Sequence, residues 1–416
     1  MPTPRILLIN QYFPPDVAAT ARMAALVART LDRRFSVTVL AGRPSYDPTT
    51  RHSVYLWRRE RWGDVVVERV GSTAASRHRM SGRLANYLSY LALAAPRALT
   101  ISADVVVAMT DPPVIGIVGA LIATLRRLPF VYNIRDLYPE MAVGAGLLPS
   151  GRLTTGWEQL HRWALRRADG VVVLGEDMRE RVVAKGVQPE RVVVVRDGAP
   201  IPAAPSRPDH PVAREIRGGF RFVVMHAGNL GFYGAWETLL KAATLLNGDG
   251  AGFVFVGTGA AAARVRTLAA SANGCVRFAP FRPESDVPYV LAAGDLHVIT
   301  VRRGLEGVVV PSKLYGILAA GRPVLAVATE DSDVARVVRR YNCGFVADPD
   351  RPDSVAQAVR EAMVSPANLA AMGSRARAAA QEFEQQAQLD RFIEVVEAVC
   401  GAGVARQSAY VNGGGA

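Results

Sequence analysis

The sequence predicts an α/β protein made of two doubly wound domains, each built on a parallel sheet. Short apolar segments alternate with helical segments along nearly the whole chain, as in sheets whose parallel strands are joined by helices. The alternation stops once, at the proline-rich segment 199–211, and then starts again. Such a segment has few apolar anchors and is typical of a linker. We therefore expect the domain boundary near residue 200.

The composition is that of a folded protein that attracts anions. Half of the 416 residues are hydrophobic, and the formal net charge at pH 7 is +12. A basic protein attracts nucleic acid, acidic lipid or phosphorylated small molecules. The sequence shows no RNA-binding motif and no zinc-finger spacing, so nucleic acid is not expected as a partner. Cys275, Cys343 and Cys400 have no metal-ligand or redox spacing and fit a reducing cytoplasm.

The first domain, residues 1–200, is expected to hold strands that are buried on both faces, because its apolar runs are nearly continuous. The expected strands are 6–10, 35–40, 65–70, 104–109, 130–134, 170–174 and 192–195, and the expected helices are 18–31, 83–99, 114–126 and 158–168. Helix 83–99 has one apolar face and is bracketed by Arg79, Arg83 and Arg97. We expect it to pack on the sheet. The alternative is an interfacial helix with its arginines toward lipid headgroups.

The second domain, residues 201–382, repeats the pattern. The expected strands are 222–227, 252–256, 276–278, 296–300, 324–327 and 344–347, and the expected helices are 236–246, 260–272, 286–293, 313–320, 332–341, 352–364 and 366–400. The remaining segment, 401–416, is rich in glycine and alanine, and we expect it to be disordered.

Polar and aromatic residues follow three strands of the first domain, where packing alone would favour apolar side chains. Ligands bind at the carboxyl ends of the strands in a parallel sheet, so these residues are candidates for a binding site. For Asp136 the alternative is a helix cap, and for Glu140 it is a solvated surface acid. The candidates are Tyr12, Pro14, Asp111, Arg135, Asp136 and Glu140.

Two strand-to-helix turns in the second domain are suited to an anion. Gly228, Asn229 and Gly231 form a glycine-rich turn that lets the backbone approach a ligand closely. About eighty residues later, Ser312, a good N-cap residue, and Lys313 begin a short helix. Free backbone N–H groups, a helix dipole and a lysine together suit a phosphate or diphosphate. Two such turns suggest a nucleotide diphosphate, and an ordinary layered α/β domain is the alternative.

Five segments occur in an order that resembles the bacterial glycosyltransferases of family four. The likeness covers about residues 5–400. It is greatest for the WbuB-like or WcaI-like branch, which takes part in O-antigen and in capsular or exopolysaccharide assembly. The segments are NQYFPP at 10–15, TDPP at 110–113, RDLYPE at 135–140, GNLG at 228–231 and PSKLY at 311–315.

The resemblance implies a GT-B fold, in which two Rossmann-like domains face a central cleft. The second domain would hold a nucleotide-sugar donor and the first an acceptor, and the last helix, at about residues 383–400, would cross back to the first domain. Members of this family retain the anomeric configuration and need no metal or other cofactor. In agreement, the loose match to a metal-binding Asp-x-Asp motif, Asp331-Ser332-Asp333, reads as the cap of the next helix.

The resemblance also assigns roles to individual residues. Lys313 would be catalytic, because its charge and the N–H groups after Ser312 stabilise the departing diphosphate. Asp136 and Glu306 are the other catalytic candidates, although Glu306 could be a plain loop charge. The expected donor-binding set is Gly228, Asn229, Gly231, Ser312, Lys313 and Tyr315, and the expected acceptor-binding set is Tyr12, Pro14, Asp111, Arg135 and Glu140.

Three features depart from the family pattern. The family's basic residue in the first turn and helix of the second domain is displaced, and residues 232–236 (FYGAW) stand there instead, which suggests stacking where other members use charge. Gly316 stands where many members have a glutamate that bonds the nucleotide ribose, and Arg135 stands near a common histidine but cannot act as a neutral base. The expected activity is transfer of a hexosyl or N-acetylhexosaminyl group to a polyprenyl-linked, polysaccharide-precursor or small-molecule acceptor. We expect a cytoplasmic protein in peripheral contact with the inner membrane. A non-hydrolysing sugar-nucleotide epimerase, or a GT-B protein that binds without turnover, is the alternative.

Overall fold

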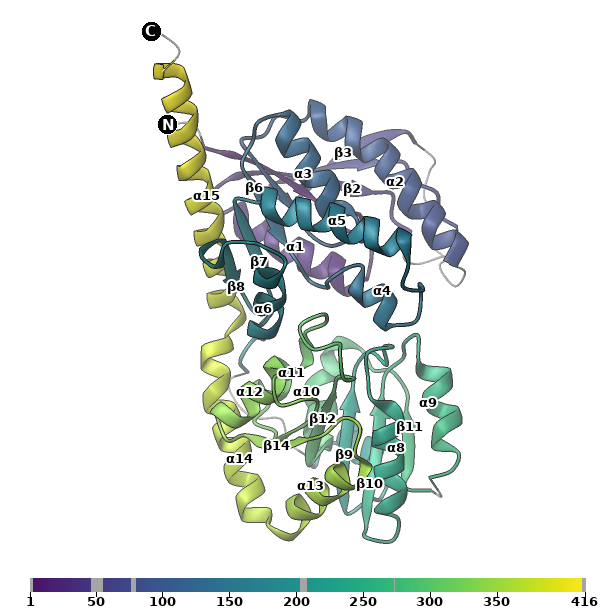
Figure 1. The fold of residues 1–416 in the computed structure, drawn as a ribbon. Helices are drawn as coiled ribbons and strands as arrows, with labels where there is room; N and C mark the ends of the chain where they lie inside the picture. Colours follow the sequence, from purple (N-terminus) through teal and green to yellow (C-terminus); the bar gives the residue numbers. More distant parts are fainter. Residues whose placement is uncertain (1–2, 46–54, 76–79, 203–207, 273, 414–416) are drawn as a thin grey trace.

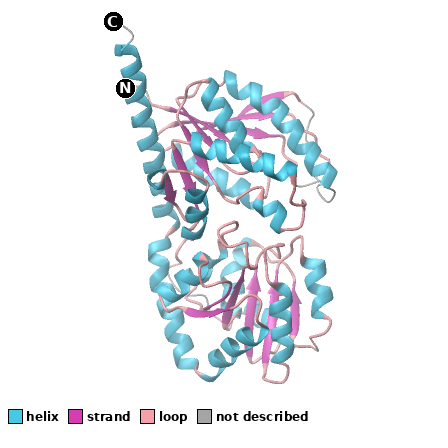
Figure 2. Ribbon diagram, viewed as in Figure 1, coloured by secondary structure: helices cyan, strands magenta, loops and turns pink. Residues whose placement is uncertain are grey.

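The computed structural model describes residues 3–45, 55–75, 80–202, 208–272 and 274–413. Two α/β domains lie one above the other, each built around its own sheet, and a long helix runs along one side of both (Figure 1). Helices cover both faces of each sheet, as the colouring by secondary structure makes clear (Figure 2). The structure therefore confirms the fold class expected from the alternation of strands and helices.

The sheet of the first domain has the strand order β3-β4-β2-β1-β5-β6-β7-β8. Its strands are β1 Arg5–Ile9, β2 Ser36–Gly42, β3 Trp57–Trp62, β4 Val65–Val70, β5 Val105–Ala108, β6 Phe130–Asn133, β7 Gly170–Val173 and β8 Val192–Val194. The pairing of β3 with β4 is antiparallel, and the other described pairings in this sheet are parallel. Strand β3 was not predicted. Its sequence, WRRERW, forms an edge strand that is exposed along most of its length, so it lacks an apolar pattern.

Two groups of helices sandwich this sheet. Helices α2 Met80–Thr100, α3 Ile115–Leu125 and α5 Arg152–Arg167 share one hydrophobic core with the strands. Helix α1 Ala19–Leu31 and the returning helix α15 Gln385–Gly413 share another core on the opposite face. Shorter elements complete the domain: α4 Glu140–Gly144, α6 Glu176–Ala184 and the 3-10 turn η1 Pro189–Arg191. The predicted helix 83–99 thus packs on the sheet, and Arg79 lies outside the described residues.

The sheet of the second domain has the order β11-β10-β9-β12-β13-β14, and its described pairings are all parallel. Its strands are β9 Phe222–Ala227, β10 Ala251–Val256, β11 Val276–Ala279, β12 Leu296–Thr300, β13 Val324–Val327 and β14 Gly344–Ala347. Its helical elements are α7 Pro211–Arg217, α8 Trp236–Leu245, α9 Ala262–Ala269, η2 Glu284–Asp286, α10 Val287–Ala293, α11 Lys313–Ala319, α12 Asp333–Arg340, α13 Pro352–Val364, α14 Pro366–Ala379 and η3 Ala380–Phe383.

The C-terminal region differs from the prediction in two ways. The expected single helix 366–400 is divided, because the chain leaves the helical conformation at Glu384. Phe383 is buried against Tyr315 and Tyr341, which anchors the turn by which the chain returns to the first domain. The segment 401–416 was expected to be disordered, but α15 continues to Gly413. This segment contains no proline and several alanines, which allows the helix to continue.

The starts of two helices, one from each domain, cap each other across the domain interface. Asp177 of α6 accepts a hydrogen bond from the backbone N of Asp333 (2.9 Å), and Asp333 of α12 accepts one from the backbone N of Glu176 (3.0 Å). The buried carboxylate of Asp333 also pairs with Arg196. Ser332 accepts from the backbone N of Ala335 (3.2 Å), so the Asp331–Asp333 segment is a helix cap, as predicted.

We expect Asp333→Ala to lower the free energy of unfolding by about 3–5 kcal/mol, because it leaves the half-buried Arg196 without its partner and removes a cap from α6. Urea denaturation followed by circular dichroism measures the change. Asp353→Ala is the matched control: it breaks an exposed pair with Arg351 at the start of another helix, and the denaturation midpoint should stay the same. Equal midpoints for the two variants would contradict the assigned role of Asp333.

Candidate active site

The loop between β12 and α11 of the second domain is inserted into the first domain. Val301, Leu305 and Val308 of this loop belong to the hydrophobic core of the first domain. Asp136 forms an antiparallel bridge with Val309, and the backbone N of Leu137 donates to the carbonyl of Val308 (3.0 Å). The insertion therefore places the carboxyl end of β6, which carries Asp136, next to the start of α11, which carries Lys313.

The structure brings the two expected anion-binding turns together around Lys313. Gly228 has a φ of 129°, which favours glycine. A Cβ atom placed on Gly228 would lie 3.6 Å from both Cε and Nζ of Lys313, so the ammonium lies directly over the turn. The side chains of Asn229 and Ser312 are exposed nearby. The ammonium of Lys313, the start of α11 and the glycine turn thus lie together where a diphosphate could bind, although the backbone N of Gly228 already donates to the carbonyl of Val256 (2.8 Å).

His226, which sequence reasoning missed, orients Lys313. It is the next-to-last residue of β9, and its Nε2 lies 3.2 Å from Nζ of Lys313. Burial, together with the charge of Lys313, holds the pKa of His226 well below its ordinary value, so the imidazole is neutral and accepts a hydrogen bond from the ammonium. Burial lowers the pKa of Lys313 to about 7. A buried histidine at the carboxyl end of a strand was the available signal.

Tyr233 links this turn to Asp136 of the first domain. Its ring centre is 6.0 Å from Nζ of Lys313, and its hydroxyl donates to the carbonyl of Asn229 (3.2 Å). Burial and the charge of Asp136 raise the pKa of Tyr233 to about 12. Burial, followed by the charge of Asp111, raises the pKa of Asp136 to about 6, with Arg135 acting in the opposite direction. Two expected carboxylates, Asp111 and Asp136, are therefore close enough for the charge of one to act on the other.

Several expected site residues have other partners. The guanidinium of Arg135 donates to both carboxylate oxygens of Asp197 (2.6 Å each), a residue that was not predicted, so Arg135 is tied to the loop after β8. Gly231 is covered by the ring of Tyr233. Pro14 is half-buried, and its carbonyl accepts from the buried Arg69.

Two aromatic residues expected in the site lie in the hydrophobic core instead. Tyr315 is buried against Phe383, with ring centres 5.4 Å apart. It comes two residues after Lys313 on α11, and two residues turn an α-helix by about 200°, so the two side chains leave opposite faces. Tyr12 is buried with Ala18, Ala21 and Tyr87. Ser312 also differs from expectation, because its backbone is already helical and its hydroxyl makes no capping bond.

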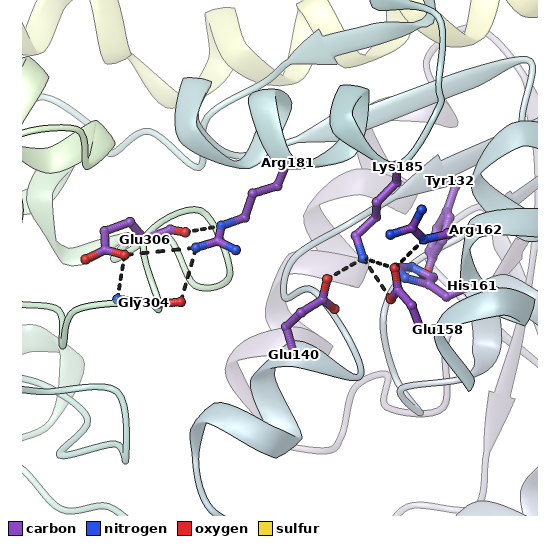
Figure 3. A network of polar contacts seen from close by, with 9 residues as sticks. All are labelled: Tyr132, Glu140, Glu158, His161, Arg162, Arg181, Lys185, Gly304 and Glu306. Atoms are coloured by element: carbon purple, nitrogen blue, oxygen red, sulfur yellow. Dashed lines mark hydrogen bonds and ion pairs between the residues drawn. The ribbon is translucent and has the colours of Figure 1, made fainter. Parts of the chain in front are cut away.

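Glu306 is held against the first domain. Its Oε2 accepts from the backbone N of Gly304 (2.8 Å) and lies 4.0 Å from a guanidinium nitrogen of Arg181 (Figure 3). Arg181, on α6, also donates to the carbonyls of Glu306 and Gly304. The other oxygen, Oε1, is buried and has no hydrogen-bond partner among the described residues. Arg181 thus fixes the loop that carries Glu306.

Two family models together match more than three quarters of the chain. The glycosyl transferase 4-like domain matches residues 18–198, and the glycosyl transferases group 1 domain matches residues 221–365. The chain belongs to the family-four glycosyltransferases. This enzyme shares 27% identity over 303 residues with a probable glycosyltransferase, WbjE of Pseudomonas aeruginosa, which covers 70% of this chain and 74% of WbjE. The identity with WcaI of Escherichia coli K12, whose name assigns it to colanic acid biosynthesis, is 24%. That match covers 59% of this chain and 63% of WcaI.

Solved structures share the GT-B fold of this glycosyltransferase. HepE of Anabaena, in complex with UDP, superposes with a TM-score of 0.69 at 18% identity and covers 95% of this chain and 100% of that one. Sucrose-phosphate synthase of Thermosynechococcus elongatus gives a TM-score of 0.74 at 15% identity, and the superposition covers 96% of this chain and 100% of the synthase. At these identities the likeness establishes the fold, and the likeness to WcaI agrees with the branch that the motifs resemble.

Glu140, an expected acceptor ligand, belongs to an ion-pair network in the first domain of the glycosyltransferase (Figure 3). The buried ammonium of Lys185 pairs with Glu140 and with both oxygens of Glu158 (2.8 Å each). Arg162 donates to Glu158 as well (2.7 Å). Burial raises the pKa of Glu158, but the bonds from Lys185 and Arg162 outweigh it and leave that pKa below its ordinary value.

A potential metal-ligand group lies in the same network. One ligand atom each from Glu140, Glu158 and His161 lie within 4.8 Å of one another. The ammonium of Lys185 already contacts both carboxylates and supplies the positive charge that they need. Burial, assisted by Lys185, lowers the pKa of His161 to about 4, so this imidazole stays neutral. We therefore assign the group to the ion-pair network, which fixes the first residue of α4.

Lys185→Met should lower the free energy of unfolding by about 3–5 kcal/mol, because it leaves two partly buried carboxylates without a counter-charge. The chain has three lysines, and Lys241 is exposed, so Lys241→Met is the matched control and should unfold like the parent protein. Thermal and urea denaturation both measure the difference. Unfolding of Lys185→Met at the parent midpoint would show that the network contributes nothing to stability.

We expect the ammonium of Lys313 to titrate near pH 7 in the free enzyme, because burial disfavours its charged form. Reductive methylation with ¹³C-formaldehyde labels the three lysines and the N-terminus. These signals are few enough to be resolved by NMR. A Lys313→Arg variant assigns the signal. Added UDP should move the midpoint upward, since a diphosphate favours the charged form. A midpoint near the ordinary lysine value would refute the burial argument.

Proposed function

We propose that this glycosyltransferase transfers a hexosyl or N-acetylhexosaminyl group from a UDP-sugar, with retention of configuration, to a lipid-linked or polysaccharide-precursor acceptor. The observation that carries the proposal is the ammonium of Lys313 over the Gly228 turn, at the end of a loop that pairs with Asp136 of the first domain through Val309. UDP is the proposed nucleotide because HepE, which shares the fold, is bound to UDP. The polysaccharide acceptor follows from the name of WcaI.

Lys313 would act on the leaving group. Cleavage of the bond between sugar and diphosphate leaves a negative charge on the terminal phosphate oxygen, and a donor fixed in advance lowers the barrier most. His226 fixes the ammonium, and the open turn at Gly228 and Asn229 exposes backbone groups to the same anion. Burial lowers the pKa of Lys313 to about 7, and the negative charge of a bound diphosphate would raise it again and favour the protonated form. This arrangement requires no metal ion.

Asp136 would act on the acceptor. Its pKa of about 6 leaves the carboxylate mostly ionised at neutral pH and able to accept the proton of an attacking hydroxyl. Its place in the first domain, adjoining the second-domain loop that carries Glu306, puts it between the proposed acceptor and donor sides. Glu306, held by Arg181, would face the donor sugar with its unpartnered oxygen.

Ribose recognition would not use a side chain at Gly316. A Cβ atom built there has Leu291 as its nearest neighbour, at 4.0 Å, so the space that a glutamate would fill is open. We propose that the backbone and neighbouring groups bind the nucleoside at this position.

None of the described helices is both long and apolar enough to cross a membrane. The proposed enzyme would reach lipid-linked acceptors from the membrane surface.

Lys313→Ala should lower turnover by about two decades or more, by analogy with the loss of one preorganised donor. Lys241→Ala, at an exposed site, should leave turnover unchanged. A panel of UDP-, GDP- and dTDP-sugars with lipid extracts, read by mass spectrometry, identifies the donor, and NMR of the product reports the anomeric configuration. Equal rates for the two variants would remove Lys313 from the mechanism. Conversion of one UDP-sugar without an acceptor would indicate an epimerase instead.

A further inference from the structure

The helix layer formed by α2, α3 and α5 has an unusually apolar outer surface. Helix α3, with the sequence IGIVGALIATL, contains no charged residue, and a helix that is apolar all round is normally buried. Its Leu121 and Leu125, one turn apart, are nevertheless 47% and 63% exposed. The inner side of α3 already packs on the sheet core, so the outer side is left to solvent.

Exposed leucines continue onto both neighbouring helices. Leu84 and Leu88 of α2 are one turn apart and more than half exposed, and Leu153 and Leu160 of α5 are two turns apart and exposed. The three helices rest on the same face of the sheet and share one core (Figure 1), so their exposed sides point the same way. We call these six exposed leucines, which lie on three helices of one layer, the leucine surface.

Positive charge surrounds the leucine surface. Neither α2 nor α3 contains an aspartate or glutamate, and the one acid of α5, Glu158, is engaged by Lys185 and Arg162. Arginines lie along its edges, among them the exposed Arg127, Arg152 and Arg166. An apolar surface rimmed by arginine fits the boundary of an anionic bilayer, where leucines enter the acyl region and arginines meet headgroup phosphates.

The leucine surface reaches the cleft. Helix α3 begins directly after the Asp111–Pro113 segment, and the start of α2 is tied to the loop after β1 by a bond from Gln11 to the carbonyl of Asn86 (3.2 Å). Tyr87 of α2 also packs beside Tyr12 of that loop. A planar partner lying on α2, α3 and α5 would thus extend to the loops that we propose hold the acceptor.

We propose that α2, α3 and α5 dock the enzyme flat on a bilayer containing anionic phospholipid, with Leu84, Leu88, Leu121, Leu125, Leu153 and Leu160 entering the interface. The proposal extends the notion of a single interfacial helix at 83–99 to a three-helix surface centred on α3. It gives the proposed lipid-linked acceptor a place to enter the cleft, but it can be tested without turnover.

The test is flotation of the full chain with vesicles of phosphatidylglycerol and phosphatidylcholine, and with vesicles of phosphatidylcholine alone. We expect binding that requires phosphatidylglycerol and weakens with salt. Leu121→Gln with Leu125→Gln should weaken binding about tenfold or more, since less apolar surface enters the interface. Arg152→Gln with Arg166→Gln should weaken it about fivefold for each arginine. Leu245→Gln with Val364→Gln, exposed on the second domain, is the matched control and should bind like the parent.

Several results would overturn the proposal. These are failure of the parent chain to float, equal flotation with neutral vesicles, or parent-like binding by the Leu121 and Leu125 variant. Light scattering tests the competing occupant, a second copy: a dimer lost in that variant, without vesicle binding, would replace the bilayer with self-association. UDP affinity by calorimetry verifies that the variant is folded. Vesicle binding by a chain that transfers no sugar would support the surface and count only against the proposed activity.

Discussion

The insertion of the β12–α11 loop into the first domain is the constraint on which the rest of the site depends. Its apolar side chains are core residues of a domain to which they do not belong in sequence, and their burial there holds the two domains together. Near its start the same loop carries Arg302, which donates to the carbonyl of Gly144, and the loop ends at Lys313. Its position therefore sets the spacing between the carboxylates of one domain and the lysine of the other. Polar contacts such as those of Asp177 and Asp333 then fix the orientation.

Much of this could be predicted from sequence because it rests on local patterns. Continuous apolar runs identified most of the strands, and glycine and proline marked their ends. The turn at Gly228 and the helix start at Lys313 were recognisable because an anion site made of backbone N–H groups uses a glycine-rich turn or a helix start in any tertiary context. That they lie together follows from their places on adjacent strands β9 and β12 of one parallel sheet.

The partners of individual side chains could not be predicted, because they come from residues distant in sequence. Arg135 was expected to bind an acceptor, but it pairs with Asp197 in the loop after β8. The alternative for Glu140 was a solvated surface acid, but Glu140 pairs with Lys185 at the end of α6. Tyr315 lies in the same PSKLY segment as Lys313, but its side chain leaves the opposite face of α11 and is buried against Phe383. His226 was overlooked because a histidine inside a strand is usually a core residue, and only the fold places Lys313 against it.

The chain crosses between the domains twice, and the two crossings touch. Ala199, on the way out of the first domain, exchanges backbone hydrogen bonds with Phe383 (3.1 Å) and Gln385 (3.3 Å), on the way back. Because the two crossings adjoin, the covalent link between the domains is a single narrow connection, about which a rotation of one domain against the other would turn. In such a rotation the contacts nearest α15 move least. Those around α4, farther from α15 (Figure 1), would move most.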